Sequence, residues 1–206
     1  MNDNVVLYGG AFDPFHNGHA YVISSIKQLG FKKIILIPTG KSPFKKKLSP
    51  SKHRLEIINK SLNINVEIND YEIQNKKTSF TIDTVDYFKK KYPNLSLIIG
   101  EDSLHSFKEW KSWELIIQQV KILIVSRLDG EAFKNFTGEK QFNFKKNIDE
   151  FIKGEPPSCF YFKGSGYEVS STEIKDAIRS KNFTFCSKHL HKNALDYIKQ
   201  NNLYSV

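Results

Sequence analysis

Cysteine is scarce in this sequence. The 206 residues include two cysteines, Cys159 and Cys186, which lie far apart in the chain and form no CxxC pair. Two cysteines at this spacing do not build the disulfide framework that stabilises small secreted proteins, so we expect free thiols and a reducing compartment.

Long apolar runs are missing as well. No run approaches the roughly 20 residues that a membrane-spanning helix needs. Asn2, Asp3 and Asn4 precede Val5, which is not the basic-then-apolar order of a signal peptide. We therefore expect a cytoplasmic protein with no membrane partner. The length and the 39% hydrophobic content suit one domain over residues 1–206, and no internal repeat divides it.

Arginine is rare although the chain is basic. Lysines and arginines total 31 against 22 acidic residues, a formal charge of +9, yet the arginines are only Arg54, Arg127 and Arg179. A positive surface attracts phosphates of nucleotides or nucleic acids, but lysine lacks the fork that reads base edges. A nucleic-acid binder that stacks bases on Phe and Tyr stays open as an alternative. No RRM, KH or helix-turn-helix signature supports it, so we expect no nucleic-acid partner.

Short apolar runs alternate with segments of helical periodicity. Strands are predicted at 5–8, 33–38, 65–68, 95–100, 121–126 and 158–164, and helices at 22–29, 49–62, 80–92, 109–120, 169–180 and 194–198. In 169–180, Ser170 and Glu173 have capping-box spacing. This alternation predicts βαβ units and an α/β fold with a parallel sheet covered on both faces. The segment 129–157, rich in Gly and Pro, is interpreted as an irregular insertion or connection.

The loop after the first predicted strand, GGAFDPFHNGH at 9–19, has the composition of a phosphate-binding loop. Gly9 and Gly10 let the backbone approach a ligand closely. Gly18 near the start of the next helix leaves backbone N–H groups accessible, and such groups favour an anion. The loop matches neither the Walker A pattern nor GxGxxG.

Two histidines in this loop are the candidate catalytic residues. His16 and His19 are three residues apart and can face the same side, where their ring N–H groups would donate to phosphate oxygens during transfer. A metal site would need a third ligand, for which Asp13 is available, but this set fits zinc or iron no better than it fits phosphate. Two purely structural histidines are the other alternative. We expect no metal held by protein side chains.

The loop closely resembles the (T/H)xGH signature of the nucleotidyltransferase superfamily, in the GGTFDPxHxGH form of bacterial nicotinate mononucleotide adenylyltransferases. Further segments resemble that family in the expected order along the chain. They are IPTGKSPFKKK, TSFTIDT, IIGEDSLHSFKEW, VSSTEIKDAI and the C-terminal YIKQNNLY.

This resemblance implies a Rossmann-like open parallel sheet with helices on both faces. It also implies adenylyl transfer from ATP to nicotinate mononucleotide, which gives nicotinate adenine dinucleotide and pyrophosphate in NAD biosynthesis. The transfer would be a direct in-line attack on the α-phosphorus, with Mg²⁺ bound through the phosphates. Such a site works by positioning and charge stabilisation.

The resemblance also implies residue roles. In the nucleotide cleft, Asp102 would lie near the adenosine ribose, and Lys45 or a neighbour would hold a phosphate. The implied ATP- or phosphate-binding residues are Gly9, Gly10, Phe12, Gly18, Lys45, Asp102, Ser171, Thr172 and Lys175. Trp110 would stack on the pyridine ring, and the backbone of Phe80 to Thr84 would recognise the nicotinate carboxylate. The implied mononucleotide residues are therefore Phe80, Thr81, Thr84 and Trp110.

Three positions depart from the family pattern. Ala11 replaces a threonine, Phe44 replaces a histidine, and Lys175 stands where ISSTxIR has arginine. Lysine keeps the charge but loses the fork, unless Arg179, one turn later, reaches the same place. Nicotinamide mononucleotide or another phosphate acceptor such as phosphopantetheine remains an alternative substrate, and a nucleotide-binding regulator without catalysis remains an alternative function. The sequence does not give the oligomeric state.

Overall fold

One parallel sheet organises the chain. The computed structural model describes residues 4–43, 47–63, 66–75, 77–126, 142–164, 167 and 169–205. The seven strands run in the order β3-β2-β1-β4-β5-β7-β6, and every recorded pair is parallel. Their bounds are Val5–Gly10 (β1), Lys33–Pro38 (β2), Glu67–Ile68 (β3), Leu95–Gly100 (β4), Lys121–Ser126 (β5), Asn143–Phe144 (β6) and Ser158–Lys163 (β7). The predicted Rossmann-like α/β fold is confirmed.

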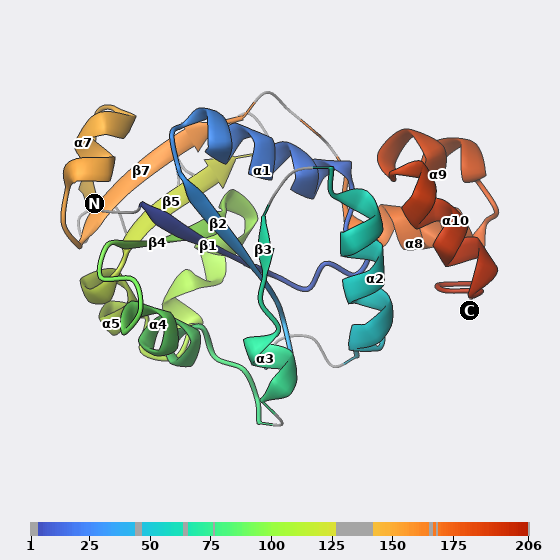
Figure 1. Cartoon of the computed structure of the whole chain (residues 1–206), viewed down its shortest axis with the longest axis horizontal. Helices are drawn as coiled ribbons and strands as arrows, with labels where there is room; N and C mark the ends of the chain where they lie inside the picture. Colours follow the sequence, from blue (N-terminus) through green and yellow to red (C-terminus); the bar gives the residue numbers. More distant parts are fainter. Residues whose placement is uncertain are drawn as a thin grey trace.

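Helices cover both faces of this sheet (Figure 1). They are α1 (Asn17–Gln28), α2 (Ser51–Ser61), α3 (Tyr71–Gln74), α4 (Thr81–Lys89), the 3₁₀ helix η1 (Glu101–Glu109), α5 (Trp113–Gln119), α7 (Ile148–Lys153), α8 (Ser171–Arg179), α9 (Phe183–His189) and α10 (Lys192–Gln200). Successive strand residues point to opposite faces, so Val6 packs with α1, α2 and α8 while Val5 and Leu7 pack with α4 and α5. Both faces of the sheet are therefore buried.

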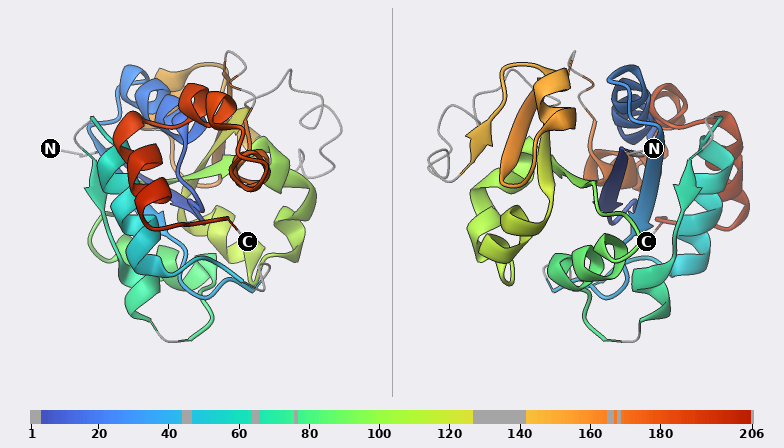
Figure 2. Two further views of the ribbon diagram at one scale, coloured as in Figure 1. Left: turned by 90° about the vertical axis from the view of Figure 1, so that its right-hand side faces the viewer. Right: turned by 60° about the vertical axis from the view of Figure 1, so that its left-hand side comes forward.

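The C-terminal helices gather at one end of the molecule, beside α1 and α2 (Figure 2). α10 packs on α2, where His53 Nδ1 and the Tyr197 hydroxyl oxygen are 2.9 Å apart. This packing brings the end of the chain close to the loops that follow β1 and β2.

The helix predicted at 109–120 is wrong in its first part. The chain forms η1 up to Glu109, and α5 begins only at Trp113. Between them Ser112 has a φ of +53°, a left-handed conformation that cannot continue a right-handed helix. Trp110 and Trp113 both pack on Phe107, with ring centroids 5.2 and 6.0 Å away.

The segment 129–157 is more regular than predicted where the structure describes it. Residues 127–141 lie outside the described part. Asn147 then caps α7 by accepting a hydrogen bond of 2.9 Å from the Glu150 N–H, and Phe151 of this helix is fully buried. The expectation of irregular structure is therefore wrong for β6, which pairs with β7, and for α7, which the Asn147 cap and the packing of Ile148, Phe151 and Ile152 on the core stabilise.

The cysteines and the lengths of the helices bear on the expectations from composition. Cys159 and Cys186 are free thiols, and both are buried. Within the described residues, no helix has the length and apolarity needed to cross a bilayer.

Candidate functional site

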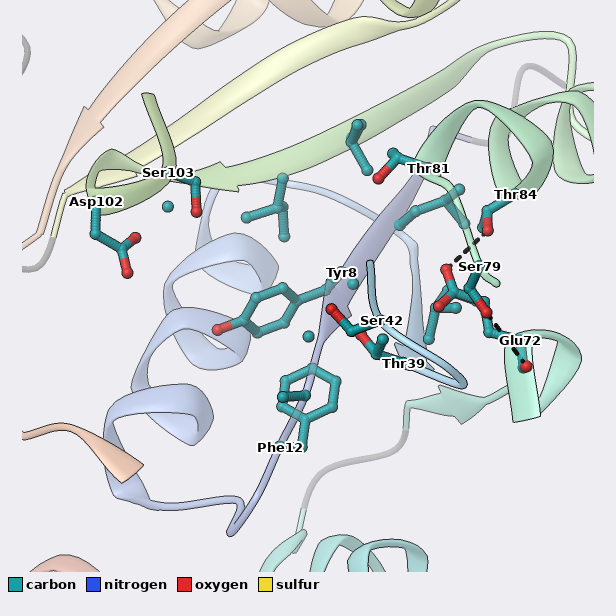
Figure 3. A pocket seen from close by; sticks show the side chains of 18 of the residues that line it. Tyr8, Phe12, Thr39, Ser42, Glu72, Ser79, Thr81, Thr84, Asp102 and Ser103 are labelled. Carbon is teal, nitrogen blue, oxygen red and sulfur yellow. Dashed lines mark hydrogen bonds between the residues drawn. The ribbon is translucent and has the colours of Figure 1, made fainter. Parts of the chain in front are cut away.

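A cavity of about 530 Å³ lies beyond the carboxyl ends of the central strands. This is the edge where ligands bind in open parallel sheets, and the volume suits a small ligand. In Figure 3, Asp102 and Ser103 lie at one end of the cavity, Thr81 and Thr84 lie at the other, and Tyr8 and Phe12 lie between them. The residues predicted from the sequence that line it are Gly9, Gly10, Phe12, His16, His19, Phe80, Thr81, Thr84, Asp102, Trp110, Ser171 and Thr172.

The two histidine rings are in contact at the junction of the loop and α1, with an angle of 34° between their planes. Their ring centroids are 3.8 Å apart, and the backbone N–H of His16 donates to His19 Nδ1 over 3.2 Å. A ring nitrogen that accepts carries no proton, so in neutral His19 the proton is on Nε2. Phe15 stacks on the His19 ring at 5.2 Å. His19 is thereby held as an Nε2–H donor in the cavity wall.

Glycine is required beside Phe12 for steric reasons. Phe12 has a φ of +46°, which is rare for a bulky residue. A Cβ at Gly10 would lie 2.8 Å from the Phe12 ring, closer than atoms pack. Gly18 likewise leaves room for the His16 ring, 3.0 Å from where its Cβ would lie. Gly18 is buried and is not among the residues that line the cavity.

Asp13 anchors the loop that carries His16 and His19, residues 9–19, which we call the histidine loop. Its side chain is 3% exposed and accepts hydrogen bonds from Lys175 Nζ (2.7 Å), the Tyr204 hydroxyl (2.8 Å) and the Ser49 N–H (3.2 Å). Burial alone would raise the pKa of the Asp13 carboxyl, but these bonds hold it below its usual value. The C-terminal segment and α8 are therefore fastened to the loop.

Lys175 therefore forms an ion pair with Asp13, and it is not among the residues that line the cavity. Arg179, the other candidate for the family's arginine, pairs with Asp176 at 2.7 Å. Lys45 and Phe44 lie outside the described residues.

Arg54, which the sequence did not single out, supports the loops around the cavity without being among the residues that line it. It is 2% exposed, and its guanidinium donates to the carbonyls of Ala11 (2.8 Å), Thr39 (2.8 Å) and Ser49 (3.0 Å). One side chain thus fixes the loops that follow β1 and β2 relative to each other. The sequence contains one indication of this role. Arg54 is one of only three arginines in the chain, and it lies within the segment of helical periodicity at 49–62.

Glu72, also not predicted, shapes the other end of the cavity (Figure 3). Its carboxylate accepts from the Thr84 hydroxyl at 2.8 Å and from the Gly40 N–H at 3.3 Å. Burial raises the pKa of the Glu72 carboxyl above its usual value. The Thr84 hydroxyl is therefore directed to a protein acceptor.

The amino end of α8 forms a further wall. Ser170 and Glu173 make the predicted capping box, with the Ser170 N–H donating to Glu173 Oε2 at 2.7 Å. The Ser171 hydroxyl donates to the Pro14 carbonyl at 3.0 Å, which joins α8 to the histidine loop. Thr172 lines the cavity beside it. The partial positive charge of this helix end suits an anion.

The side chains around the cavity do not form a metal site within the described residues. Among the described residues, no three His, Cys, Asp or Glu side chains gather as a metal site. The carboxylates among the described lining residues, Glu72 and Asp102, lie at opposite ends (Figure 3). The donors among the described lining residues include backbone amides, imidazoles, hydroxyl groups and the Lys111 ammonium group, and these suit phosphate oxygens.

Comparison with known proteins gives consistent matches. A family model described as cytidylyltransferase-like matches residues 7–177. The chain is 33% identical over 217 residues to a probable nicotinate-nucleotide adenylyltransferase of Leptospira interrogans, covering 100% of both chains. It is 34% identical over 176 residues to one of Aquifex aeolicus, covering 82% of this chain and 99% of the relative. The solved Plasmodium falciparum nicotinic acid mononucleotide adenylyltransferase complexed with NaAD has a TM-score of 0.77 and 22% identity, covering 98% of this chain and 97% of that one. That likeness shows the shared fold.

Proposed function

This chain belongs to the cytidylyltransferase-like family, and within it to the nicotinate-nucleotide adenylyltransferases, so we propose that its cavity transfers the adenylyl group of ATP to nicotinate mononucleotide. The product is nicotinate adenine dinucleotide, as in the late steps of NAD biosynthesis. The observation that carries the proposal is the meeting of the histidine loop, the amino end of α8 and the segment 80–84 around one cavity.

The reaction is a displacement at phosphorus. A phosphate oxygen of the mononucleotide attacks the α-phosphorus of ATP, and the bond from that phosphorus to the bridging oxygen breaks. Pyrophosphate leaves with the electron pair, and no covalent enzyme intermediate forms. The protein contributes alignment of the two substrates and hydrogen-bond donors for the charge that develops on the phosphate oxygens.

His16 and His19 are the proposed donors to the transferring phosphates. The bond from His16 N–H to His19 Nδ1 supports this role for His19, because it leaves Nε2–H available to donate. The Thr172 hydroxyl and the backbone N–H groups of Ser171 and Thr172, at the amino end of α8, would hold the distal phosphates, since the Ser171 hydroxyl donates to the Pro14 carbonyl. Gly9, Gly10, Phe12 and Asp102 would line the adenosine part of the cavity. Lys45, outside the described residues, remains a proposed phosphate ligand.

The mononucleotide would occupy the end of the cavity near α4. Trp110 and Phe80 would flank its ring, and the backbone N–H groups of Thr81 and Ile82 at the start of α4 would donate to the nicotinate carboxylate. The N–H groups of Asp83 and Thr84 donate instead to the Phe80 carbonyl. In this account Thr84 shapes the end of the cavity without donating to the ligand, since its hydroxyl bonds Glu72 and its N–H bonds the Phe80 carbonyl.

Mg²⁺ would enter with ATP, held by the phosphates, and would neutralise part of their charge. Gly18 and Lys175 are proposed to act indirectly, Gly18 beside His16 and Lys175 through Asp13. Lys175 is therefore no sign of a regulator without catalysis. We further propose that residues 1–206 work as one domain in the cytoplasm.

ATP labelled with ³²P at the α-phosphate tests the proposal. With nicotinate mononucleotide and Mg²⁺, the label should appear in the dinucleotide, whereas label at the γ-phosphate should appear in pyrophosphate. Label from the α-phosphate that stays with protein after denaturation would contradict direct transfer. Transfer only to nicotinamide mononucleotide or to phosphopantetheine would replace the proposed substrate.

A further inference from the structure

Lys111 lies in the wall of the cavity directly after Trp110. Of the described residues that line the cavity, it is the one lysine or arginine. Its Nζ lies 4.5 Å from the centroid of the Phe80 ring, and this cation–π contact holds the ammonium group beside the amino end of α4. The positively charged Lys111 ammonium group therefore lies where the mononucleotide ring is proposed to bind.

Within the part of the chain that the structure describes, no ion pair within 4.0 Å joins the exposed Lys111 side chain to a carboxylate. Glu72, the carboxylate at this end of the cavity, instead accepts from Thr84 and Gly40. The Lys111 ammonium group is thus available to a negatively charged ligand.

We propose that Lys111 determines the preference for the acid mononucleotide over its amide, by placing an ammonium charge near the pyridine carboxylate. This inference rests on the proposed function. The two mononucleotides differ in one substituent, which is anionic in nicotinate and neutral in nicotinamide. Backbone N–H groups can donate to the carbonyl oxygen of either substituent. A full positive charge, in contrast, stabilises the bound acid and offers no equal gain to the amide.

Steady-state kinetics of matched variants test this role. The kcat/KM for each mononucleotide would be measured in the wild type, Lys111→Gln and Lys111→Arg. The control is Lys108→Gln, which removes the same charge from an exposed position on η1 outside the cavity lining. We expect Lys111→Gln to lower the ratio of acid to amide about tenfold, through a higher KM for the acid. Lys111→Arg and Lys108→Gln should keep the ratio within about twofold.

Salt gives a second readout that a merely structural role would not move. Screening by salt should lower the ratio of acid to amide more steeply in the wild type than in Lys111→Gln. An unchanged ratio in Lys111→Gln would overturn the proposal while leaving the proposed function intact. An equal decrease in kcat/KM for both mononucleotides would also overturn it, since Lys111 would then contact a group that the acid and the amide share. A wild type that uses neither mononucleotide would overturn the proposed function and this inference together.

Discussion

Lys175 Nζ and Asp13 Oδ2 are 2.7 Å apart, although the two residues are separated by 162 positions in the sequence. The lysine belongs to α8, and the carboxylate lies three residues before His16 in the loop after β1. The position where the family motif has arginine is therefore used to hold the histidine loop in place. The Tyr204 hydroxyl bonds the other Asp13 oxygen, so the end of the chain supports the same loop.

Removal of the lysine should damage both stability and catalysis. In Lys175→Met the buried Asp13 carboxylate loses its cation, which should lower the free energy of unfolding by about 1–3 kcal/mol. The loosened loop should lower kcat about tenfold, because misplaced donors stabilise the transition state less. Denaturant unfolding and pyrophosphate release measure the two effects. Lys175→Arg, which keeps the charge, should retain activity equal to the wild type or higher. A raised KM for ATP with unchanged stability would instead place Lys175 on a phosphate.

Loss of the His19 ring should act mainly on the chemical step. We expect His19→Ala to lower kcat on the order of a hundredfold or more, as loss of a transition-state donor does. His105→Ala is the control, since His105 is exposed and is not among the residues that line the cavity. A variant that keeps its kcat and changes only KM would show that His19 binds the ground state.

Lys121 predicts a pH dependence of stability. Its side chain is 2% exposed, its Nζ donates to the Ile152 carbonyl at 2.7 Å, and burial lowers its pKa to about 8. Between pH 8 and the ordinary lysine pKa, the unfolded chain binds the proton that the folded chain has lost. The free energy of unfolding should therefore rise with pH in this window.

Other groups also titrate there, so the quantity to measure is the difference between wild type and Lys121→Met. From pH 7 to pH 10, this difference should move in favour of the wild type by about 2–3 kcal/mol. The unpaired Ile152 carbonyl of the variant contributes equally at both pH values and cancels. A difference that stays constant would show that the folded and unfolded lysines titrate alike.

Local sequence patterns were sufficient for six of the seven strands and for the residues that follow them, but not for β6 (Asn143–Phe144), which lies in the segment expected to be irregular. The run at 5–8 and the glycines after it identified β1 and the loop that carries His16 and His19, because backbone preference and hydrophobic period act over short distances. The capping box at Ser170 was predictable for the same reason, and it is present.

Contacts between distant segments were not predictable in this way. Nothing in the residues around Asp13 indicates that Lys175 and Tyr204 bond its carboxylate. The position of Lys111 was not predictable, because the sequence predicts a continuous helix at 109–120. The chain instead breaks at Ser112, and this break sets the position of Lys111 at the cavity. Such features depend on packing, which one chain segment does not encode alone.

The most direct test of the proposed activity is pyrophosphate release by the purified protein with ATP and Mg²⁺, with nicotinate mononucleotide and nicotinamide mononucleotide offered in parallel. We expect release that requires a mononucleotide, with kcat/KM strongly favouring the acid. Release with neither mononucleotide, from protein that is folded and binds ATP, would contradict the account.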